Sequence, residues 1–350
     1  MSARGFLGSA ALLFLLACQP AAPAPAPQPA QAGSSAAAVQ PTATSSPVPL
    51  HPVRFGLTTV SGTVAPIWVA LEQEIFTRHG LAVETVAMSP AAVSQALTAG
   101  SLDLATSGGS AISAYVGGAT DLVFVAGLVN KAHFKVLSRP ELASMEELRG
   151  KTIGSSTAGS GASMALFETL RRFGLEPNRD VQISYLREQP NIASGLLSGA
   201  VDAGVLAPPF TDQVEAQGAR VLVDMRQFNV ELAGTNLTTT RTFLAREREV
   251  ARRFVMAYAE ALRFAREHRE PTVAAIVRGT QNPDRQQAES AYAIYRDLWD
   301  LWPTEGAIQT VLNNLDEPGA DRVRPAELLD LSILHELERS GWLAQHYGAP

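Results

Sequence analysis

Residues 154–163 have the types and spacing of a loop that could hold an anion. They read GSSTAGSGAS and lie between a short apolar segment and the helix-like sequence MALFETLRRFG. Backbone N–H groups at the start of a helix are unpaired and favour negative charge, while Ser and Thr hydroxyls add donors without bulk. Ser and Thr at such positions also serve as simple helix caps. We favour a ligand-binding loop, because a second loop with the same chemistry, TTVSGTVAP, occurs earlier in the chain.

The same stretch departs from three better-defined motifs. Gly154 and Gly159 have the glycine spacing of a P-loop, but Ser160 and Gly161 stand where Lys and Ser or Thr are required. Met164 replaces the third glycine of a dinucleotide fingerprint. GSGAS also lacks the spacing of a G-x-S-x-G elbow, and no His lies near it in the chain. The stretch therefore predicts neither a nucleotide site nor a serine nucleophile.

Histidine and cysteine usage gives no catalytic or metal motif. The 6 histidines are scattered, and HELER at 335–339 has Arg339 where a zinc helix needs its second His. His133, close to Lys131, could approach a cleft, although we favour a surface role for it. The single cysteine excludes an internal disulfide and a Cys metal site. We expect no catalytic residue, no metal and no cofactor.

The N-terminus predicts export and a lipid anchor. After Arg4 comes the apolar run FLGSAALLFLLA, which is too short to span a bilayer. It ends in LLAC, which resembles a bacterial lipobox, so residues 1–18 are predicted to be a lipoprotein signal peptide with acylation, palmitate included, on Cys18. The alternative is a plain signal peptide with an incidental cysteine. Residues 19–51 are rich in Pro, Ala, Ser and Thr and predict a disordered tether.

The folded part contains an internal repeat. Gly100-Ser-Leu-Asp103 matches Gly199-Ala-Val-Asp202, and two further glycine dipeptides recur at a similar separation of roughly 100 residues. A repeat of this length indicates a duplicated lobe. Each unit alternates short apolar strands with helix-like segments, which predicts an α/β fold with mainly parallel sheets.

The repeat also predicts how the lobes are connected. Lobe II, residues 138–234, is inserted into lobe I, residues 52–137 plus 235–350 with the C-terminal helices. HFKVLSRP and ELAGTNLTTTRTFLA would form the two crossings of a two-strand hinge. Helices are expected over APIWVALEQEIFTRHG, REVARRFVMAYAEALRFAREH, QAESAYAIYRDLWDLW and PAELLDLSILHELERSGWL. Because ligands bind beyond the carboxyl ends of parallel strands, the polar loops should face one crevice between the lobes.

The order of these segments resembles the type II solute-binding proteins of ABC importers. The resemblance covers roughly residues 53–265 and rests on TTVSGTVAP, LTAGSLDLATSGG, LRGKTIGSSTAGSG and LLSGAVDAGVLAPPF. It is greatest to the nitrate, sulfonate, taurine, bicarbonate and thiamine-precursor group. It implies a two-lobed, periplasmic-binding-protein-like fold that closes over a small ligand. It also implies an ABC permease and its ATPase as partners, and an extracytoplasmic, lipid-anchored protein in the bacterial cell envelope.

The candidate ligand-binding residues come from the strand-end loops and the crossings. They are Thr58, Thr59, Ser61, Gly62, Thr63, Trp68, Thr106, Ser107, Gly108, Gly109, Asn130, Ser155, Ser156, Gly159, Ser160, Gly161, Ser163, Pro208, Phe210, Thr235 and Asn236. Trp68 is equally consistent with a place in the core.

The loops suggest the ligand class. They contain no Asp, Glu or Arg, and only Lys131 is near, so a ligand with a buried positive charge would lack a partner. We therefore expect a small organic anion or an uncharged heterocycle, and disfavour amino-group ligands. The net charge of −6 gives no excess of basic residues of the kind that nucleic-acid binding requires. A sensor module acting through a membrane receptor and an enzyme on the same scaffold remain alternatives, and we expect a monomer.

Overall fold

A computed structural model describes residues 49–208 and 210–348 of the 350-residue chain. The predicted signal peptide, Cys18 and nearly all of the predicted tether lie outside these residues. Val48–Pro350 forms one compact unit. Within the described residues, no helix combines the length and apolar character that crossing a bilayer requires.

Two five-stranded sheets form the framework, with strand orders β2-β1-β3-β10-β4 and β7-β6-β8-β5-β9. In each sheet one strand is antiparallel to its neighbours, β10 in the first and β5 in the second. The strands are β1 His51–Leu57, β2 Leu81–Ala87, β3 Leu104–Ser107, β4 Leu122–Lys131, β5 Lys135–Ser138, β6 Thr152–Ser155, β7 Gln182–Tyr185, β8 Ala203–Leu206, β9 Arg220–Asp224 and β10 Glu231–Thr240.

Helices flank both sheets. The α-helices are α1 Ala65–Glu72, α2 Ile75–Arg78, α3 Pro90–Thr98, α4 Gly109–Val116, α5 Gly161–Arg172, α6 Gln189–Ser198, α7 Phe210–Glu215, α8 Arg241–Arg246, α9 Arg248–Glu267, α10 Arg269–Thr280, α11 Arg285–Tyr295, α12 Glu305–Asn314, α13 Ser332–Arg339 and α14 Trp342–His346. The 3-10 helices are η1 Gly62–Val64, η2 Glu146–Leu148, η3 Met225–Phe228, η4 Ala320–Arg322 and η5 Pro325–Leu328.

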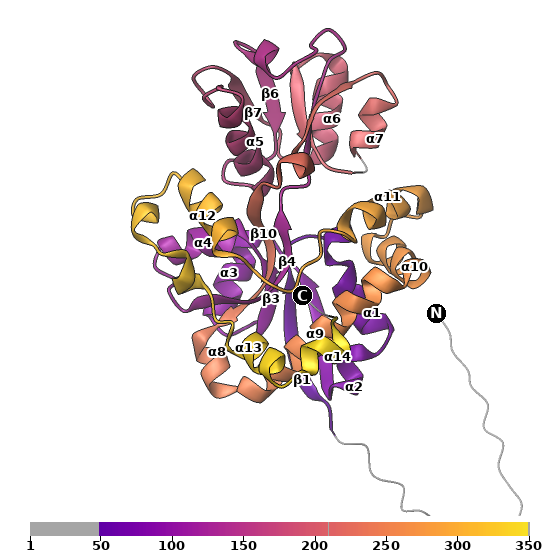
Figure 1. Ribbon diagram of the computed structural model, residues 1–350, viewed down its shortest axis with the longest axis vertical. Coiled ribbons are helices and arrows are strands. Elements are labelled where there is room, and N and C mark those ends of the chain that lie inside the picture. The colour runs from indigo at the N-terminus through magenta and orange to yellow at the C-terminus, as the bar shows by residue number, and fades with distance from the viewer. Residues whose placement is uncertain (1–48, 209, 349–350) are drawn as a thin grey trace, which may run out of the picture. The chain divides into compact units, whose positions relative to one another are not determined.

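The chain crosses twice between the two sheets (Figure 1). It leaves the first sheet at the end of β4, enters the second at Lys135, and returns after Asp224 into β10. β10 lies between β3 and the edge strand β4 and pairs with both. The second lobe is therefore inserted into the first, and the C-terminal helices α9–α14 belong to the first lobe (Figure 1).

The two aspartates of the sequence repeat, Asp103 and Asp202, make equivalent hydrogen bonds in the two lobes. An Asp103 carboxylate oxygen accepts from the backbone N–H of Arg54 in β1 at 2.8 Å. An Asp202 carboxylate oxygen accepts from the backbone N–H of Thr152 in β6 at 2.9 Å. Each aspartate thus ties the turn before β3 or β8 to the neighbouring parallel strand, β1 or β6.

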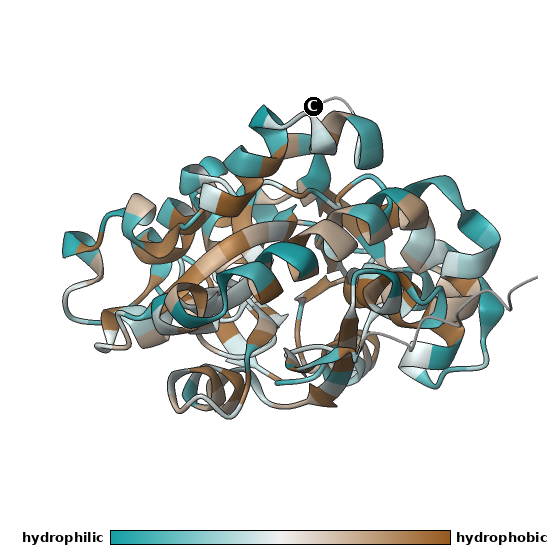
Figure 2. Ribbon diagram, turned by 90° about the horizontal axis from the view of Figure 1, so that it is seen from below, coloured by the Kyte–Doolittle hydropathy of each residue, from teal (hydrophilic) through white to brown (hydrophobic). Residues whose placement is uncertain are grey.

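Three apolar clusters make up the core, and hydrophobic residues gather along the strands and the helix faces turned toward them (Figure 2). One cluster lies between the first sheet and helices that include α1 and α9. A second runs from α3, α4 and α12 through Leu232 and Ala233 of β10 into the second lobe beside α5. A third lies beside α6 and α7. Because the second cluster includes residues of both lobes, apolar packing continues across the connection between them.

Three of the helices expected from sequence are shorter or divided. The helix expected over 65–80 breaks at Glu74, whose φ of 53° lies in the left-handed region. The helix expected over 287–302 ends at Tyr295, because Trp299 forms an isolated antiparallel bridge with Val129 of β4. The segment 325–343 becomes η5 and α13, followed by the start of α14. Apolar spacing alone overestimated helix length at each place.

Candidate functional site

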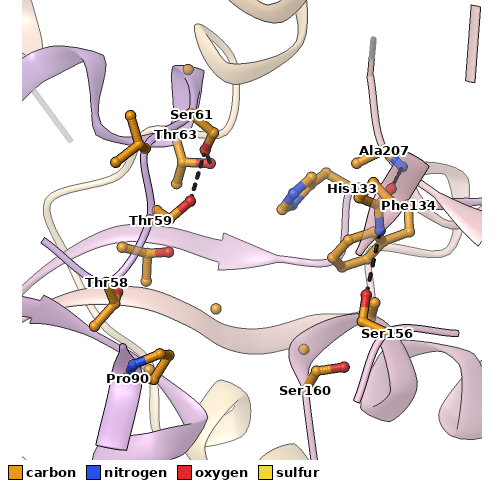
Figure 3. A pocket seen from close by; sticks show the side chains of 18 of the residues that line it. Thr58, Thr59, Ser61, Thr63, Pro90, His133, Phe134, Ser156, Ser160 and Ala207 are labelled. Carbon is orange, nitrogen blue, oxygen red and sulfur yellow. Dashed lines mark hydrogen bonds between the residues drawn. The ribbon is translucent and has the colours of Figure 1, made fainter. Parts of the chain in front are cut away.

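A cleft of about 1000 Å³ lies between the two lobes, and both lobes and the crossing segment line it (Figure 3). Polar loops reach it from the ends of β1 and β3 in the first lobe and of β6 and β8 in the second. The prediction that strand-end loops converge on one crevice is confirmed for the described residues.

The loop after β1 places a row of hydroxyl groups on the cleft wall. Thr59 donates to the Ser61 hydroxyl at 3.2 Å, and Ser61 donates to the Thr63 hydroxyl at 3.1 Å. The backbone N–H of Thr58 donates to the buried Thr106 hydroxyl at 3.2 Å, which fixes the loop to the end of β3. Ser61 precedes η1 but makes no side-chain cap bond to it. These hydroxyls therefore bond mainly to one another.

Helix α4 begins at the cleft without a side-chain cap, because Gly108 is its N-cap residue. A Cβ at Gly108 would lie 2.2 Å from the carbonyl oxygen of Gly234 in β10, so only glycine allows this approach. The first turn of a helix has unpaired N–H groups. This helix start can therefore offer backbone donors to a ligand.

The loop after β6 is held by a buried serine cluster. The Ser163 hydroxyl donates to the backbone oxygen of Thr157 at 2.9 Å and lies 2.8 Å from the Ser155 hydroxyl. Ser160 caps α5 by accepting from the backbone N–H of Ser163 at 3.3 Å. Ser155 and Ser163 are fully buried, whereas Ser160 reaches the cleft. Ser163 consequently positions the loop instead of facing the ligand space.

Gln189, the first residue of α6, joins two loops of the second lobe. Its amide nitrogen donates to the Ser156 hydroxyl at 3.4 Å, and its amide oxygen accepts from the backbone N–H of Ala207 at 2.8 Å (Figure 3). Beyond Ala207, Pro208 and Phe210 add apolar surface to the same wall. Both polar ends of the Gln189 amide are thus used within the protein.

An aromatic group lies where the chain crosses between the lobes. The His133 ring stacks on Phe134, with centroids 4.5 Å apart, and meets the Tyr295 ring edge-on at 5.1 Å. All three residues line the cleft. Removal from water lowers the pKa of His133 to about 4, so its imidazole is neutral at pH 7. The surface role predicted for His133 was wrong, because the crossing segment turns the ring inward.

The cleft also contains carboxylates. Asp284 caps α11 and accepts from the side chain of Gln287 at 2.8 Å, while Glu317 accepts from the Ser113 hydroxyl. Neither forms a salt bridge with a residue of the described ranges. The strand-end loops contribute no acidic residue to the cleft, but its lining as a whole includes these two. Both acids lie in connections of the C-terminal region, Asp284 directly before α11 and Glu317 after α12, which the strand-end loops do not predict.

Fourteen of the predicted ligand-binding residues line the cleft. They are Thr58, Thr59, Ser61, Gly62, Thr63, Gly108, Gly109, Ser156, Gly159, Ser160, Gly161, Pro208, Phe210 and Thr235.

Seven of the predicted residues lie outside that lining and are buried. They are Trp68, Thr106, Ser107, Asn130, Ser155, Ser163 and Asn236. Trp68 packs in the core so closely against Gly279 that a Cβ there would lie 2.2 Å from the indole ring. Asn130 donates to the backbone oxygen of Trp302 at 3.3 Å.

Sequence reasoning missed a wall built by the C-terminal helices. Ile276, Thr280, Gln287 and Tyr295 of α10 and α11 line the cleft, together with Asp284. Asp284 carried one usable signal, since Asp is one of the residues preferred at the N-cap of a helix. No local pattern shows that this helix start faces the same cleft as the loop at Thr58, which lies more than 200 residues earlier in the chain.

The arrangement can bind a small polar molecule. In the described ranges, no cluster of three or more His, Cys, Asp or Glu side chains could hold a metal ion. The cleft instead combines helix starts, hydroxyl groups, aromatic rings and a few charges. With its two α/β lobes and double crossing, this is a periplasmic-binding-protein fold of the class that the sequence resembles.

Family and structural comparisons agree with that class. Residues 61–272 match the family described as NMT1/THI5 like, and the chain belongs to this family. No curated protein sequence matches the chain.

Solved structures of the same fold are similar at low sequence identity. The alkanesulfonate-binding protein SsuA of Xanthomonas axonopodis pv. citri, bound to MOPS, has a TM-score of 0.66 at 20% identity, covering 81% of this chain and 99% of its own. The periplasmic aliphatic sulphonate-binding protein SsuA of Escherichia coli has a TM-score of 0.64 at 22% identity, covering 81% and 91%. The periplasmic nitrate-binding protein NrtA of Synechocystis PCC 6803 has a TM-score of 0.65 at 14% identity, covering 84% and 90%.

Proposed function

We propose that this protein is an extracytoplasmic solute-binding protein. It captures a small organic anion or heterocycle between its two lobes and delivers it to an ABC permease driven by a cytoplasmic ATPase. It acts as a monomer without a cofactor and without catalysis.

The observation that carries this proposal is the convergence of polar loops from both lobes on one cleft. The α4 start from the first lobe and the α5 start from the second both reach it, and Ser and Thr hydroxyls surround them. Helix starts attract anions through their unpaired N–H groups and their dipoles. The similar proteins named above bind alkanesulfonates and nitrate, which are anions, and this supports the same ligand class here.

A thermal-shift panel tests the ligand class. It would contain alkanesulfonates, nitrate, bicarbonate, aromatic carboxylates and aminopyrimidines. A ligand at 100 times its Kd should stabilise the fold by about 2.7 kcal/mol, which raises the Tm by several degrees. A hit that is recovered chemically unchanged supports a binding protein, whereas a hit that is consumed supports the enzyme alternative.

We further propose that a lipid on Cys18 holds the protein at the extracytoplasmic membrane surface. LLAC resembles a lipobox, and 19–51 would link the anchor to the folded unit. Replacing Cys18 by Ser should release the protein from the membrane fraction while leaving its thermal stability unchanged. Continued membrane attachment of the Cys18→Ser protein would contradict the anchor.

A further inference from the structure

The histidine at the lobe crossing has one ring nitrogen engaged and the other available. Nδ1 of His133 lies 3.4 Å from the backbone oxygen of Lys131. A carbonyl oxygen only accepts hydrogen bonds, so Nδ1 must carry the proton in this contact. In the neutral ring Nε2 is then an acceptor, and no hydrogen bond joins it to another described residue.

The surroundings orient this acceptor toward the ligand space. The ring stacks on Phe134 and touches the edge of Tyr295, and its side chain projects into the cleft toward the loop with Thr59 and Thr63 (Figure 3). Tyr295 is itself buried. The ring is therefore packed by neighbours that limit its rotation.

Removal from water, more than any neighbouring charge, lowers the pKa of the His133 ring, while its hydrogen bond to the Lys131 backbone acts in the opposite direction. Lys131 lies two residues before His133 at the end of β4, and Tyr295 contacts the ring from α11. The positive charge of Arg226 in η3 lowers the pKa of His133 further. Arg226 is paired with Asp224. No carboxylate of the described residues forms a salt bridge with His133.

Most other polar groups on the cleft wall can donate, and the two carboxylates there, Asp284 and Glu317, already accept from the side chains of Gln287 and Ser113. The helix starts offer N–H groups, and the loops offer hydroxyls. Such groups suit the anionic or carbonyl end of a ligand, whereas Nε2 of His133 suits a donor.

We propose that His133 is a specificity-determining residue that selects ligands bearing an O–H or N–H group in addition to their anionic end. This inference rests on the proposed binding function and narrows its ligand class. It predicts that hydroxylated anions bind better than their plain hydrocarbon counterparts. The preference comes from a neutral acceptor and needs no negative charge in the protein.

Matched probes test this with the full chain by isothermal titration calorimetry. The first pair is 2-hydroxyethanesulfonate and propane-1-sulfonate, which differ by a hydroxyl in place of a methyl. The second pair is 4-hydroxybenzenesulfonate and 4-methylbenzenesulfonate. We expect wild type to prefer the hydroxyl member of at least one pair, and His133→Phe to reduce that preference about fivefold to tenfold.

Three controls separate this from a structural effect. His268→Phe makes the same change in another histidine stacked on a phenylalanine, Phe264, outside the cleft lining, and should keep the preference. His133→Gln retains a hydrogen-bond acceptor and should keep part of the preference for the hydroxyl probe. If His133→Phe folds poorly, the comparison is made with His133→Gln instead. The wild-type preference should stay constant from pH 7.5 to 5.5, because the pKa lies well below this range.

The outcomes distinguish failure of the proposed role of His133 from failure of the proposed anion-binding function. If sulfonates bind but His133→Phe has the wild-type preference, or wild type has none, the inference about His133 is overturned and the binding function stands. A preference that fades near pH 6.5 also overturns it. If no probe in either pair binds wild type, the anion-binding function fails and the inference fails with it.

Discussion

The loop after β1 and the loop after β6 hold equivalent places in the sequence repeat, but their hydroxyls are used differently. In the first lobe, Thr59, Ser61 and Thr63 bond along the cleft wall, and Ser61 makes no cap bond. In the second lobe, Ser160 caps α5 and Ser163 is buried beneath the loop. Both loops are rich in hydroxyl groups, but in the second lobe more of these hydroxyls form hydrogen bonds that hold the loop and cap α5. The first lobe therefore has the more available polar surface for a ligand.

The second strand-end loops differ as well. The loop after β3 begins α4 with two glycines, whereas the loop after β8 presents Ala207, Pro208 and Phe210. Polar contacts from the first lobe would thus be opposed by an apolar wall from the second. This division of roles fits a ligand with an anionic end and a less polar body.

The largest effect should come from the close approach at the α4 start. Gly108→Ala places a Cβ against the backbone of Gly234 and should lower the free energy of unfolding by about 3 kcal/mol, because neither backbone can move freely. Gly109→Ala is the matched control, since its Cβ would have no neighbour nearer than 3.7 Å. Urea denaturation of both variants measures the difference. Equal stabilities would mean that the α4 start is not held against β10.

Ser163 tests whether the second-lobe loop is structural. Ser163→Ala removes the partner of the buried Ser155 hydroxyl as well as a donor to the Thr157 carbonyl, and should cost about 2 kcal/mol of stability. A ligand found by the thermal-shift panel should retain most of its affinity for the folded variant. A large loss of affinity with unchanged stability would instead place Ser163 in contact with the ligand.

Alanine substitution of the two serines at N-cap positions, Ser160 and Ser61, should change the free energy of unfolding by smaller and unequal amounts. Ser160→Ala removes an N-cap bond and should cost about 1 kcal/mol. Ser61→Ala removes no cap bond and should cost less than about 0.5 kcal/mol. Denaturation curves for the pair give the difference directly. The asymmetry between the lobes would be wrong if Ser61→Ala were the more damaging change.

The segment joining the lobes should add a modest pH dependence. The pKa of His133 falls from 6.5 to about 4 on folding, so between these values the unfolded chain binds a proton that the folded chain does not. Stability should therefore fall as pH drops through this window. His133→Phe should make that decline shallower, measured as the free energy of unfolding at pH 7, 5.5 and 4.5. Parallel curves for the two proteins would show that His133 is not desolvated.

Sequence reasoning reached those features of the fold that depend on local repeats. The paired Gly and Asp motifs predicted two similar lobes, and Asp103 and Asp202 indeed bond to equivalent strands. Glycines after helices were recognisable too, since Gly80 and Gly174 have positive φ values.

The parts that could not be predicted depend on long-range contacts. Tyr295 and Asp284 reach the cleft only because α11 folds back onto the first lobe beside η1. The helix expected to continue past Tyr295 ends there because Trp299 bonds to the backbone of Thr63 and bridges to β4. His133 looked like a surface residue because nothing in its neighbourhood in the chain indicates Tyr295 packing over it.

One measurement tests the central claim that a small ligand binds in the cleft between the lobes. The strongest hit of the thermal-shift panel would be titrated calorimetrically into wild type, Ala158→Trp and Ala216→Trp. Ala158 is exposed and lines the cleft, whereas Ala216 is exposed outside its lining, so the two variants add the same bulk in different places. We predict one ligand per wild-type chain, unchanged binding by Ala216→Trp and at least tenfold weaker binding by Ala158→Trp, with the ligand recovered intact. Equal binding by all three proteins, or conversion of the ligand, would contradict the account.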